Sequence, residues 1–196
     1  MKIELLDLYG IDHALFGIGL SHGLTSGYED WISLTPELRQ RLYGVAEKLC
    51  AKDGGHNKFL RQIEFWWDAT FPRFLWQEVD QYRIGVTTQS ESTMHTIMNR
   101  DLVQEDFEGE VHPYVLGTLN GYIEAYRLQK TEKAFLMLKN ALPEGFLQRR
   151  VWSLSLAQMK NIYHQRKSHR LPQWKSICQE FFDATPLFLR GIYGQD

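Results

Sequence analysis

The chain has 196 residues, 43% of them hydrophobic and 13% aromatic, which is enough to bury a full core as a single domain spanning residues 1–196. Its formal net charge of -2 gives no general attraction to nucleic acid or to an anionic membrane surface, so neither partner is expected. Its two cysteines, Cys50 and Cys178, lie far apart without C-x-x-C spacing, which favours reduced thiols in a cytoplasmic protein.

The N-terminal part combines glycine-spaced apolar pieces with one clear helix. Residues 1–34 are interrupted repeatedly by glycine, a pattern that favours short strands and loops over a helix. Their longest apolar run contains charged residues and is too short to span a membrane. Thr35 and Pro36 are typical of a helix start, and the apolar spacing that follows predicts a helix ending before Asp53.

The rest of the chain is predicted to be mostly helical. Pro72 marks a bend, and Pro113 opens a long apolar pattern with helical spacing. The sum is a helix-rich α/β or α+β fold. The predicted elements are a strand at 59–67 (where a helix is also possible), a helix at 73–84, two helices within 112–139 with the second starting near Lys130, a helix at 147–166, and a short helix at 173–182.

A dense polar run follows the aromatic segment and begins four residues after Arg83. So many hydrogen-bonding groups suggest a site for an oxygen-rich, phosphorylated ligand. The alternative for the run is a polar surface loop. The alternative for Arg83 is a surface arginine paired with Asp80 or Glu78. The run consists of Thr87, Thr88, Gln89, Ser90, Glu91, Ser92, Thr93 and His95.

The order of these segments resembles the flavin-dependent thymidylate synthase family, without a gap from about Lys58 to Gln89. In that family an F-E-H segment leads through an alanine-proline step to R-H-R and then to an N-E-x-S cluster. The corresponding segments here are Phe59-Leu60-Arg61-Gln62, Phe71-Pro72, Gln81-Tyr82-Arg83 and Thr88-Gln89. The resemblance implies a helix-rich single domain with a small antiparallel sheet, and FAD as the cofactor.

The resemblance also implies an activity and an assembly. A flavin-dependent thymidylate synthase transfers a one-carbon unit and a hydride to C5 of deoxyuridylate, using FAD, reduced nicotinamide cofactor and methylenetetrahydrofolate. The family is typically a homotetramer that shares its ligands between subunits. No metal is expected, because His164 and His169 are five residues apart and do not share a helix face.

Site residues carry over from the family position by position. The implied flavin contacts are His56, Asn57, Arg83, Thr88, Gln89, His164 and Arg166. The implied nucleotide contacts are Glu78, Gln81, Gln89, Ser90, Glu91, Ser92, Arg149 and Arg150.

Three departures remove positive charges that the family pattern contains. Gln81, Thr93 and Ile177 stand where the family has arginines, and the arginine replaced by Ile177 polarises the uracil ring in the family. A second hypothesis is therefore a catalytically divergent or inactive member that acts as a nucleotide-binding, flavin-binding or assembly protein. A third is a helical interaction protein unrelated in function.

Overall fold

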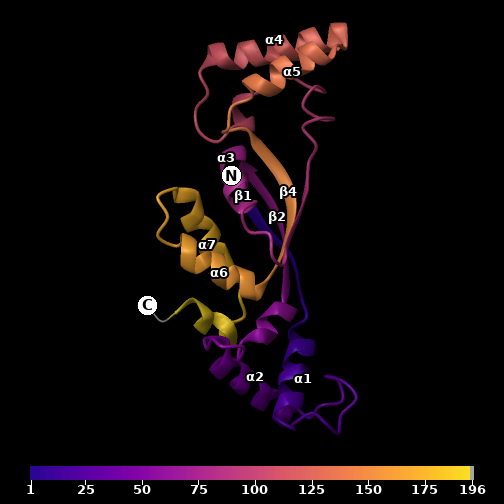
Figure 1. Ribbon diagram of the computed structural model, residues 1–196, viewed down its shortest axis with the longest axis vertical. Coiled ribbons are helices and arrows are strands. Elements are labelled where there is room, and N and C mark those ends of the chain that lie inside the picture. The colour runs from indigo at the N-terminus through magenta and orange to yellow at the C-terminus, as the bar shows by residue number, and fades with distance from the viewer. Residues whose placement is uncertain (195–196) are drawn as a thin grey trace. The chain divides into compact units, whose positions relative to one another are not determined.

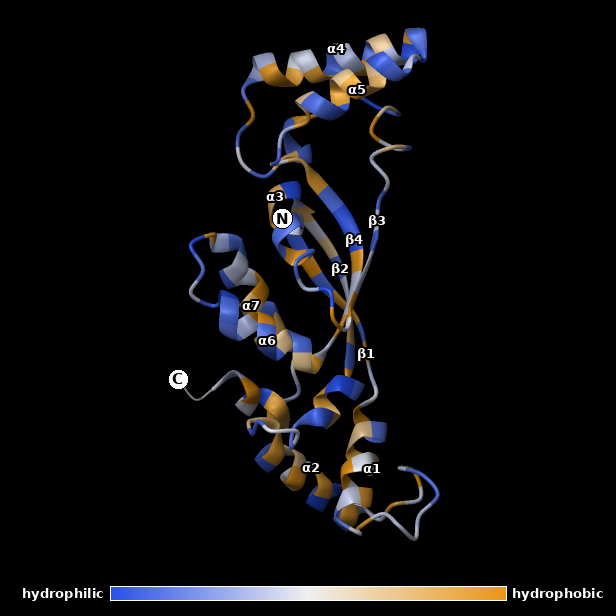
Figure 2. Cartoon of the chain, in the orientation of Figure 1, coloured by the Kyte–Doolittle hydropathy of each residue, from blue (hydrophilic) through white to orange (hydrophobic). Residues whose placement is uncertain are grey.

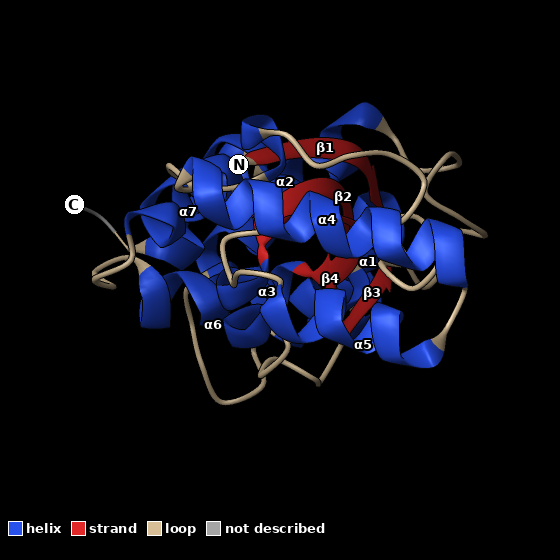
Figure 3. Cartoon of the chain, turned by 90° about the horizontal axis from the view of Figure 1, so that it is seen from above, coloured by secondary structure: helices blue, strands red, loops and turns tan. Residues whose placement is uncertain are grey.

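The computed structural model describes residues 1–194 (Figure 1). Its fold is helix-rich, with a four-stranded antiparallel sheet in the order β1-β2-β4-β3, drawn in red in Figure 3. The predicted fold class is therefore confirmed. The strands are β1 (Lys2–Tyr9), β2 (Glu64–Pro72), β3 (Val86–Ser90) and β4 (Leu147–Ser155).

The chain divides into two compact units, and every strand of the sheet contributes residues to both. The first, called the α4–α5 unit, comprises Met1–Lys2, Asp68–Tyr82 and Thr88–Val151. The second, called the α1–α2 unit, comprises Ile3–Trp67, Arg83–Thr87 and residues 152–194. That residues 1–196 form a single domain stays a prediction.

The core of the α1–α2 unit is aromatic. The rings of Trp67 and Trp152 both approach the ring of Phe181, with centroids 5.5 and 5.6 Å away. All three side chains are buried, so this cluster excludes water beneath the sheet residues of the unit. The helices of the unit are α1 (Ile11–Ser21), α2 (Pro36–Cys50), η1 (Lys58–Gln62), α6 (Leu156–Arg166), α7 (Pro172–Ala184) and η3 (Leu187–Tyr193).

The α4–α5 unit has its own apolar cluster, in which Leu119, Ile123 and Leu138 are almost fully buried. These residues come from the two long helices, which pack together and alternate hydrophobic with hydrophilic residues (Figure 2). Helix α5 begins where Thr131 Oγ1 accepts a hydrogen bond from Ala134 N at 3.3 Å. The helices are α3 (Arg73–Val79), η2 (Gln104–Asp106), α4 (Pro113–Gln129) and α5 (Glu132–Ala141).

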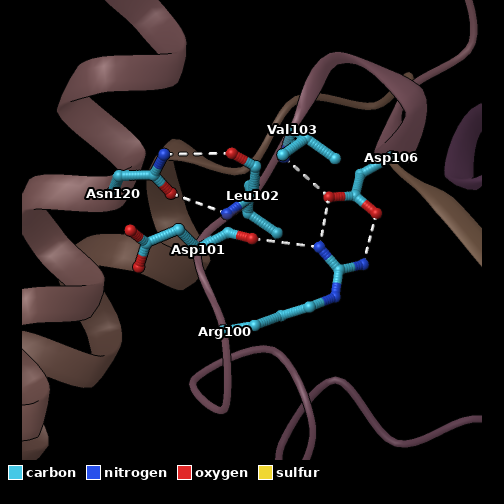
Figure 4. Close-up of polar contacts among 6 residues, drawn as sticks. All are labelled: Arg100, Asp101, Leu102, Val103, Asp106 and Asn120. Carbon is cyan, nitrogen blue, oxygen red and sulfur yellow. Dashed lines mark hydrogen bonds and ion pairs between the residues drawn. The ribbon is translucent and has the colours of Figure 1, made fainter.

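A polar clamp fixes residues 100–106 to α4 (Figure 4). Asn120 of α4 accepts a hydrogen bond from Leu102 N at 2.8 Å and donates one to Leu102 O at 3.0 Å. The Arg100 guanidinium pairs with both carboxylate oxygens of Asp106, and Asp106 also accepts from Val103 N at 2.8 Å. Because one amide satisfies both backbone groups of Leu102, this irregular segment keeps its polar groups paired.

The expectation of strands and loops throughout residues 1–34 is wrong for α1. The glycines that suggested loops serve packing instead. A Cβ on Gly19 would lie 2.3 Å from Thr25 Cγ2, so the absent side chain makes room for a fully buried threonine. Thr25 Oγ1 then donates to Phe16 O at 3.1 Å. Glycine here allows close approach inside a helix, which the sequence pattern alone does not distinguish from a turn.

The helix predicted at 147–166 is wrong over its first half, which is strand β4. Buried Trp152 and Leu154 alternate with half-buried Val151 and Ser153, the two-residue period of a strand. Ser155 then caps α6 by accepting from Gln158 N at 3.4 Å. The apolar spacing suited both structures, and β4 is a strand because it is hydrogen-bonded between β2 and β3.

The other predicted boundaries hold in part. Helix α2 begins as predicted, with Thr35 Oγ1 accepting from Leu38 N at 3.3 Å. The 59–67 segment starts as η1 before it becomes β2, and the helix predicted at 73–84 ends at Val79. Strand β3, within the polar run, was not predicted, because its polar residues lack the alternation of a half-buried strand.

Gly10 makes a close backbone contact that any amino acid with a side chain would block. Its φ is 87°, and an added Cβ would lie 2.1 Å from Gln62 O. We expect Gly10→Ala to lower the free energy of unfolding by about 2–4 kcal/mol, measured by urea denaturation. Gly44→Ala is the matched control, because an added Cβ in α2 meets nothing within 4 Å. That control should gain about 0.5–1 kcal/mol, and equal effects of the two changes would contradict the assignment.

Candidate functional site

A cavity of about 620 Å³ lies in the α1–α2 unit. Its walls are partly apolar, with Ile18, Leu49 and Phe59 among them. Its polar groups come from the end of α1 and from the loop and 3-10 turn around residues 55–62. The polar lining residues are Ser21, His22, His56, Lys58 and Gln62. An apolar cavity with a few convergent polar groups is typical of a small-molecule site.

Of the sequence-predicted flavin residues, His56 lines this cavity. Asn57, its neighbour in the chain, lines a different one of about 300 Å³ together with His164. Arg83 is exposed just before β3, and the Arg166 guanidinium lies 5.0 Å from the centre of the Trp174 ring. The structure thus brings Asn57 and His164 together and separates both from the cavity of His56.

The polar run after Arg83 is tied to strand β4 in the α4–α5 unit. Thr88, Gln89 and Ser90 end β3. Glu91 N donates to Arg149 O at 2.8 Å, and Gln148 Nε2 donates to Glu91 O at 2.9 Å. The chain turns at Ser92, whose Oγ accepts a hydrogen bond from Met94 N at 3.2 Å. The run is therefore held by hydrogen bonds to strand β4 and by its own turn at Ser92.

Both arginines predicted to bind a phosphate are paired with carboxylates. Arg149 forms a two-pronged ion pair with Asp68, with the shortest N–O distance 2.5 Å. Arg150 Nη1 lies 2.8 Å from Asp80 Oδ1, and its guanidinium lies 4.3 Å from the centre of the Trp76 ring. Arg150 is mostly buried, whereas the Arg149 side chain is 66% exposed. Arg149 is thus the more solvent-accessible of the two.

Glu78 and Gln81 lie at the end of α3 and just after it. They share the α4–α5 unit with the polar run and with both arginines. All eight residues predicted to bind the nucleotide therefore belong to one compact unit.

Lys139 is a residue that the sequence analysis missed. Its Nζ donates to Thr93 Oγ1 at 2.5 Å, and within residues 1–194 no carboxylate forms an ion pair with this ammonium. Burial, and then the nearby Arg73 guanidinium, lower the pKa of Lys139. A partly buried ammonium beside a hydroxyl and a second cation is suited to an anionic ligand. No local pattern signals it, because Lys139 and Thr93 are 46 residues apart.

Other chemistries find no support in the side chains described. Burial raises the pKa of the Cys178 thiol to about 11, and burial also raises that of Cys50, so neither is a ready nucleophile. In the part of the chain that is described, no group of three His, Cys, Asp or Glu side chains is arranged to hold a metal ion. No helix within residues 1–194 is long and apolar enough to cross a membrane.

Solved structures identify the fold. Two crystal structures of thymidylate synthase ThyX from Helicobacter pylori, the flavin-dependent enzyme determined with FAD and dUMP, each match with a TM-score of 0.69. Each is 16% identical in sequence to this chain, and each match covers 99% of this chain and 98% of the ThyX chain. The chain therefore has the fold of the flavin-dependent thymidylate synthases. Neither a family model nor a curated protein matches the sequence.

The Arg149–Asp68 pair should make stability depend on pH. The hydrogen bonds from Arg149 lower the pKa of Asp68. The contribution of the ion pair to the free energy of unfolding is therefore present above the unfolded-state pKa of Asp68, and it is lost as pH falls through the folded-state pKa. At pH 7 we expect Asp68→Asn to cost less than about 1 kcal/mol, because Arg149 is largely in solvent. The difference in stability between the wild-type protein and the variant should shrink toward zero near pH 2, well below the ordinary aspartate pKa of about 3.9. Urea denaturation at both pH values measures it.

The control for this change is Glu110→Gln, which removes an exposed carboxylate in the same unit. It should leave the stability almost unaltered at both pH values. A penalty for Asp68→Asn that stays constant with pH would contradict the ion-pair explanation.

Proposed function

We propose that the protein is a flavin-dependent thymidylate synthase-like enzyme, which transfers a one-carbon unit and a hydride to C5 of deoxyuridylate. Its cofactor is FAD, and its cosubstrates are reduced nicotinamide cofactor and methylenetetrahydrofolate. The observation that carries the proposal is the 620 Å³ cavity lined by His56, in a chain with the fold of enzymes that bind FAD and dUMP.

The cavity fits the ring system of a flavin by its chemistry. Ile18, Leu49 and Phe59 offer apolar surface to a flat aromatic ring system. His56 and Gln62 offer hydrogen-bonding groups for its polar edge. Bound there, FAD supplies the redox step of the reaction. The chain's own residues position the ring and keep water from it.

The α4–α5 unit carries the residues proposed to bind the nucleotide. Lys139, beside Thr93, is the cation best placed for the phosphate, because it has no carboxylate to give up. Arg149 is a second cation, which must exchange Asp68 for the ligand. The side chains of Gln89, Ser90, Glu91 and Ser92 supply donors and acceptors for the sugar and base. Arg83 offers a guanidinium fork for flavin oxygens.

The proposal includes a homotetramer in the cytoplasm. Exposed apolar side chains on α4 and α5 support assembly with further copies, because such side chains are commonly covered in assemblies. Tyr114 and Leu128 are 79% and 78% exposed, and Leu136 and Met137 are also exposed. The two free cysteines are compatible with a reducing compartment.

A specific observation favours the second candidate, a binding or assembly protein that has lost the chemistry. Ile177 stands where the family has the arginine that polarises uracil, and it is completely buried in α7. A buried isoleucine supplies no charge to a ligand. In this reading the protein still binds its ligands and turnover is absent.

Flavin retention tests the cofactor. After incubation with FAD and desalting, the protein should keep bound flavin, seen in its visible absorption spectrum, and the bands should shift when deoxyuridylate is added. We expect His56→Ala to weaken flavin binding about tenfold, the effect of losing one good polar contact. His13→Ala is the matched control, an exposed histidine on α1 outside the cavity. A colourless wild-type protein overturns the proposed cofactor, and equal retention by both variants overturns the role of His56.

Nucleotide affinity tests the phosphate contact. We expect Lys139→Gln to weaken deoxyuridylate binding about tenfold or more, because a charge-assisted contact is lost, and to leave flavin retention unchanged. Binding of deoxyuridine, which lacks the phosphate, should not respond to the change. Calorimetric titration of both ligands measures this. Lys133→Gln removes the same charge from an exposed site on α5 and should have no effect. Equal losses for nucleotide and nucleoside would contradict a phosphate contact.

A further inference from the structure

Two places in the chain carry dipeptides that readily close a backbone succinimide ring, and the structure treats them differently. Asn120-Gly121 and Asp53-Gly54 each put a side-chain carbonyl carbon next to the amide nitrogen of a glycine. Because glycine has no Cβ, its nitrogen is the least hindered backbone nucleophile. By sequence alone Asn120 is the more reactive of the two, since ammonia leaves an amide more easily than water leaves a carboxyl group.

Asn120 is protected by its backbone conformation and by its side-chain contacts. It lies in the middle of α4, and ring closure requires a backbone ψ far from the helical value of about −42°. Both groups of its amide belong to the polar clamp, because Oδ1 accepts from Leu102 N at 2.8 Å and Nδ2 donates to Leu102 O at 3.0 Å. Attack on this amide therefore requires α4 to open locally and the clamp to break.

Asp53 lies outside regular secondary structure. Helix α2 ends at Cys50, and Asp53 belongs to no helix or strand. The Asp53 side chain is 89% exposed, so water and protons reach its carboxyl group. Its Oδ1 lies 3.1 Å from Lys160 Nζ. An ion pair with one solvated member is weak, so this contact does not fix the carboxyl group in one place.

The nucleophile beside Asp53 is equally accessible. Within residues 1–194, Gly54 N makes no hydrogen bond. Gly54 and Gly55 have φ of 68° and 89°, and a Cβ added to either would meet nothing within 4 Å. The loop at Asp53 therefore has room for its backbone to turn as the ring closes, without any helix or strand having to open.

We propose that Asp53 is a site of spontaneous isoaspartate formation, and that Asn120 is protected from the same chemistry. Gly54 N loses its proton and bonds to Asp53 Cγ, and one carboxyl oxygen leaves as water, which closes the succinimide. Water then opens the ring. Cleavage of the bond to Cγ restores aspartate, and cleavage of the bond to the main-chain carbonyl carbon leaves isoaspartate. One water is released and one is consumed, so no oxidant, reductant or cofactor takes part.

The isoaspartate linkage changes the loop in which it forms. The backbone gains one methylene group between Asp53 Cα and Gly54 N, and the free carboxylate then stands directly on Cα. Its oxygens no longer extend on the side chain that reaches Lys160. His56 and Asn57 follow in the same loop, and each lines a cavity. The modification therefore alters the backbone that carries both of these residues.

Incubation of the full-length protein in mildly acidic water labelled with heavy oxygen tests the proposal. Isoaspartate is located by mass spectrometry with electron-transfer fragmentation and counted with an isoaspartyl methyltransferase. We expect it at Asp53, with one labelled oxygen, at a rate within about tenfold of that in a free peptide of residues 50–58. The rate at Asn120 should be about a hundredfold or more below that of its own free peptide, because α4 must open first.

Two changes at Asp53 have opposite expected effects. Asp53→Glu keeps the charge but requires a larger ring, and it should abolish the modification at this position. Asp53→Asn should speed the modification about tenfold, because ammonia replaces water as the leaving group. Asp12→Glu is the matched control, since it makes the same change at an exposed carboxylate of α1 and should leave the rate at Asp53 unaltered.

Each of three results would overturn the proposal. The first is a protein that forms no isoaspartate at Asp53 while the free peptide forms it. The second is an equal rate at Asn120 and Asp53 in the folded protein. The third is an isoaspartate at Asp53 without labelled oxygen, because such a product did not arise from a succinimide opened during the incubation. Failure of flavin or deoxyuridylate binding in the earlier experiments leaves these outcomes unchanged.

Discussion

Gln148 holds together the polar elements of the α4–α5 unit. Its backbone carbonyl accepts from Trp76 Nε1 at 2.8 Å, which fixes helix α3 to strand β4. Its side chain donates to Glu91 O at 2.9 Å and accepts from the Arg150 guanidinium at 3.0 Å. One residue thus links α3, the polar run that includes β3, and Arg150 of β4. Because its amide uses both its donor and its acceptor, no hydrophobic residue of similar size can replace it.

This arrangement separates cations that hold the fold from cations available to a ligand. Arg150 is mostly buried between Asp80, Gln148 and the Trp76 ring, so removing it would leave paired polar groups unsatisfied. Arg149 is solvated and can exchange partners at small cost. Lys139 and Arg61 lie at the other extreme, without a carboxylate among the residues described. The pairing of each cation, and not its place in a motif, therefore indicates where an anion can bind.

The sequence predicted helix α2 and the helical pair after Pro113, because caps, prolines and apolar spacing are local signals, whereas the small antiparallel sheet was predicted by the family resemblance. It failed for α1 and for β4, where tertiary contacts decide. Gly19 is helical because Thr25 packs on it, and residues 147–155 are a strand because they pair with β2 and β3. The site shows the same division. Motif order predicted His56, which lines a cavity, but Lys139 draws attention only when residues distant in the chain come together.

The departures from the family pattern differ in their physical consequences. At Thr93 the missing charge has a nearby replacement, since the Lys139 ammonium donates to the threonine hydroxyl. At Ile177 there is none, because the side chain is completely buried and belongs to the core. An arginine there would have to move its charge out of the core or lose its hydration, at a cost of several kcal/mol. For the proposed function, a phosphate contact is thus easier to supply from this chain's residues than polarisation of the base, and the two should be measured separately.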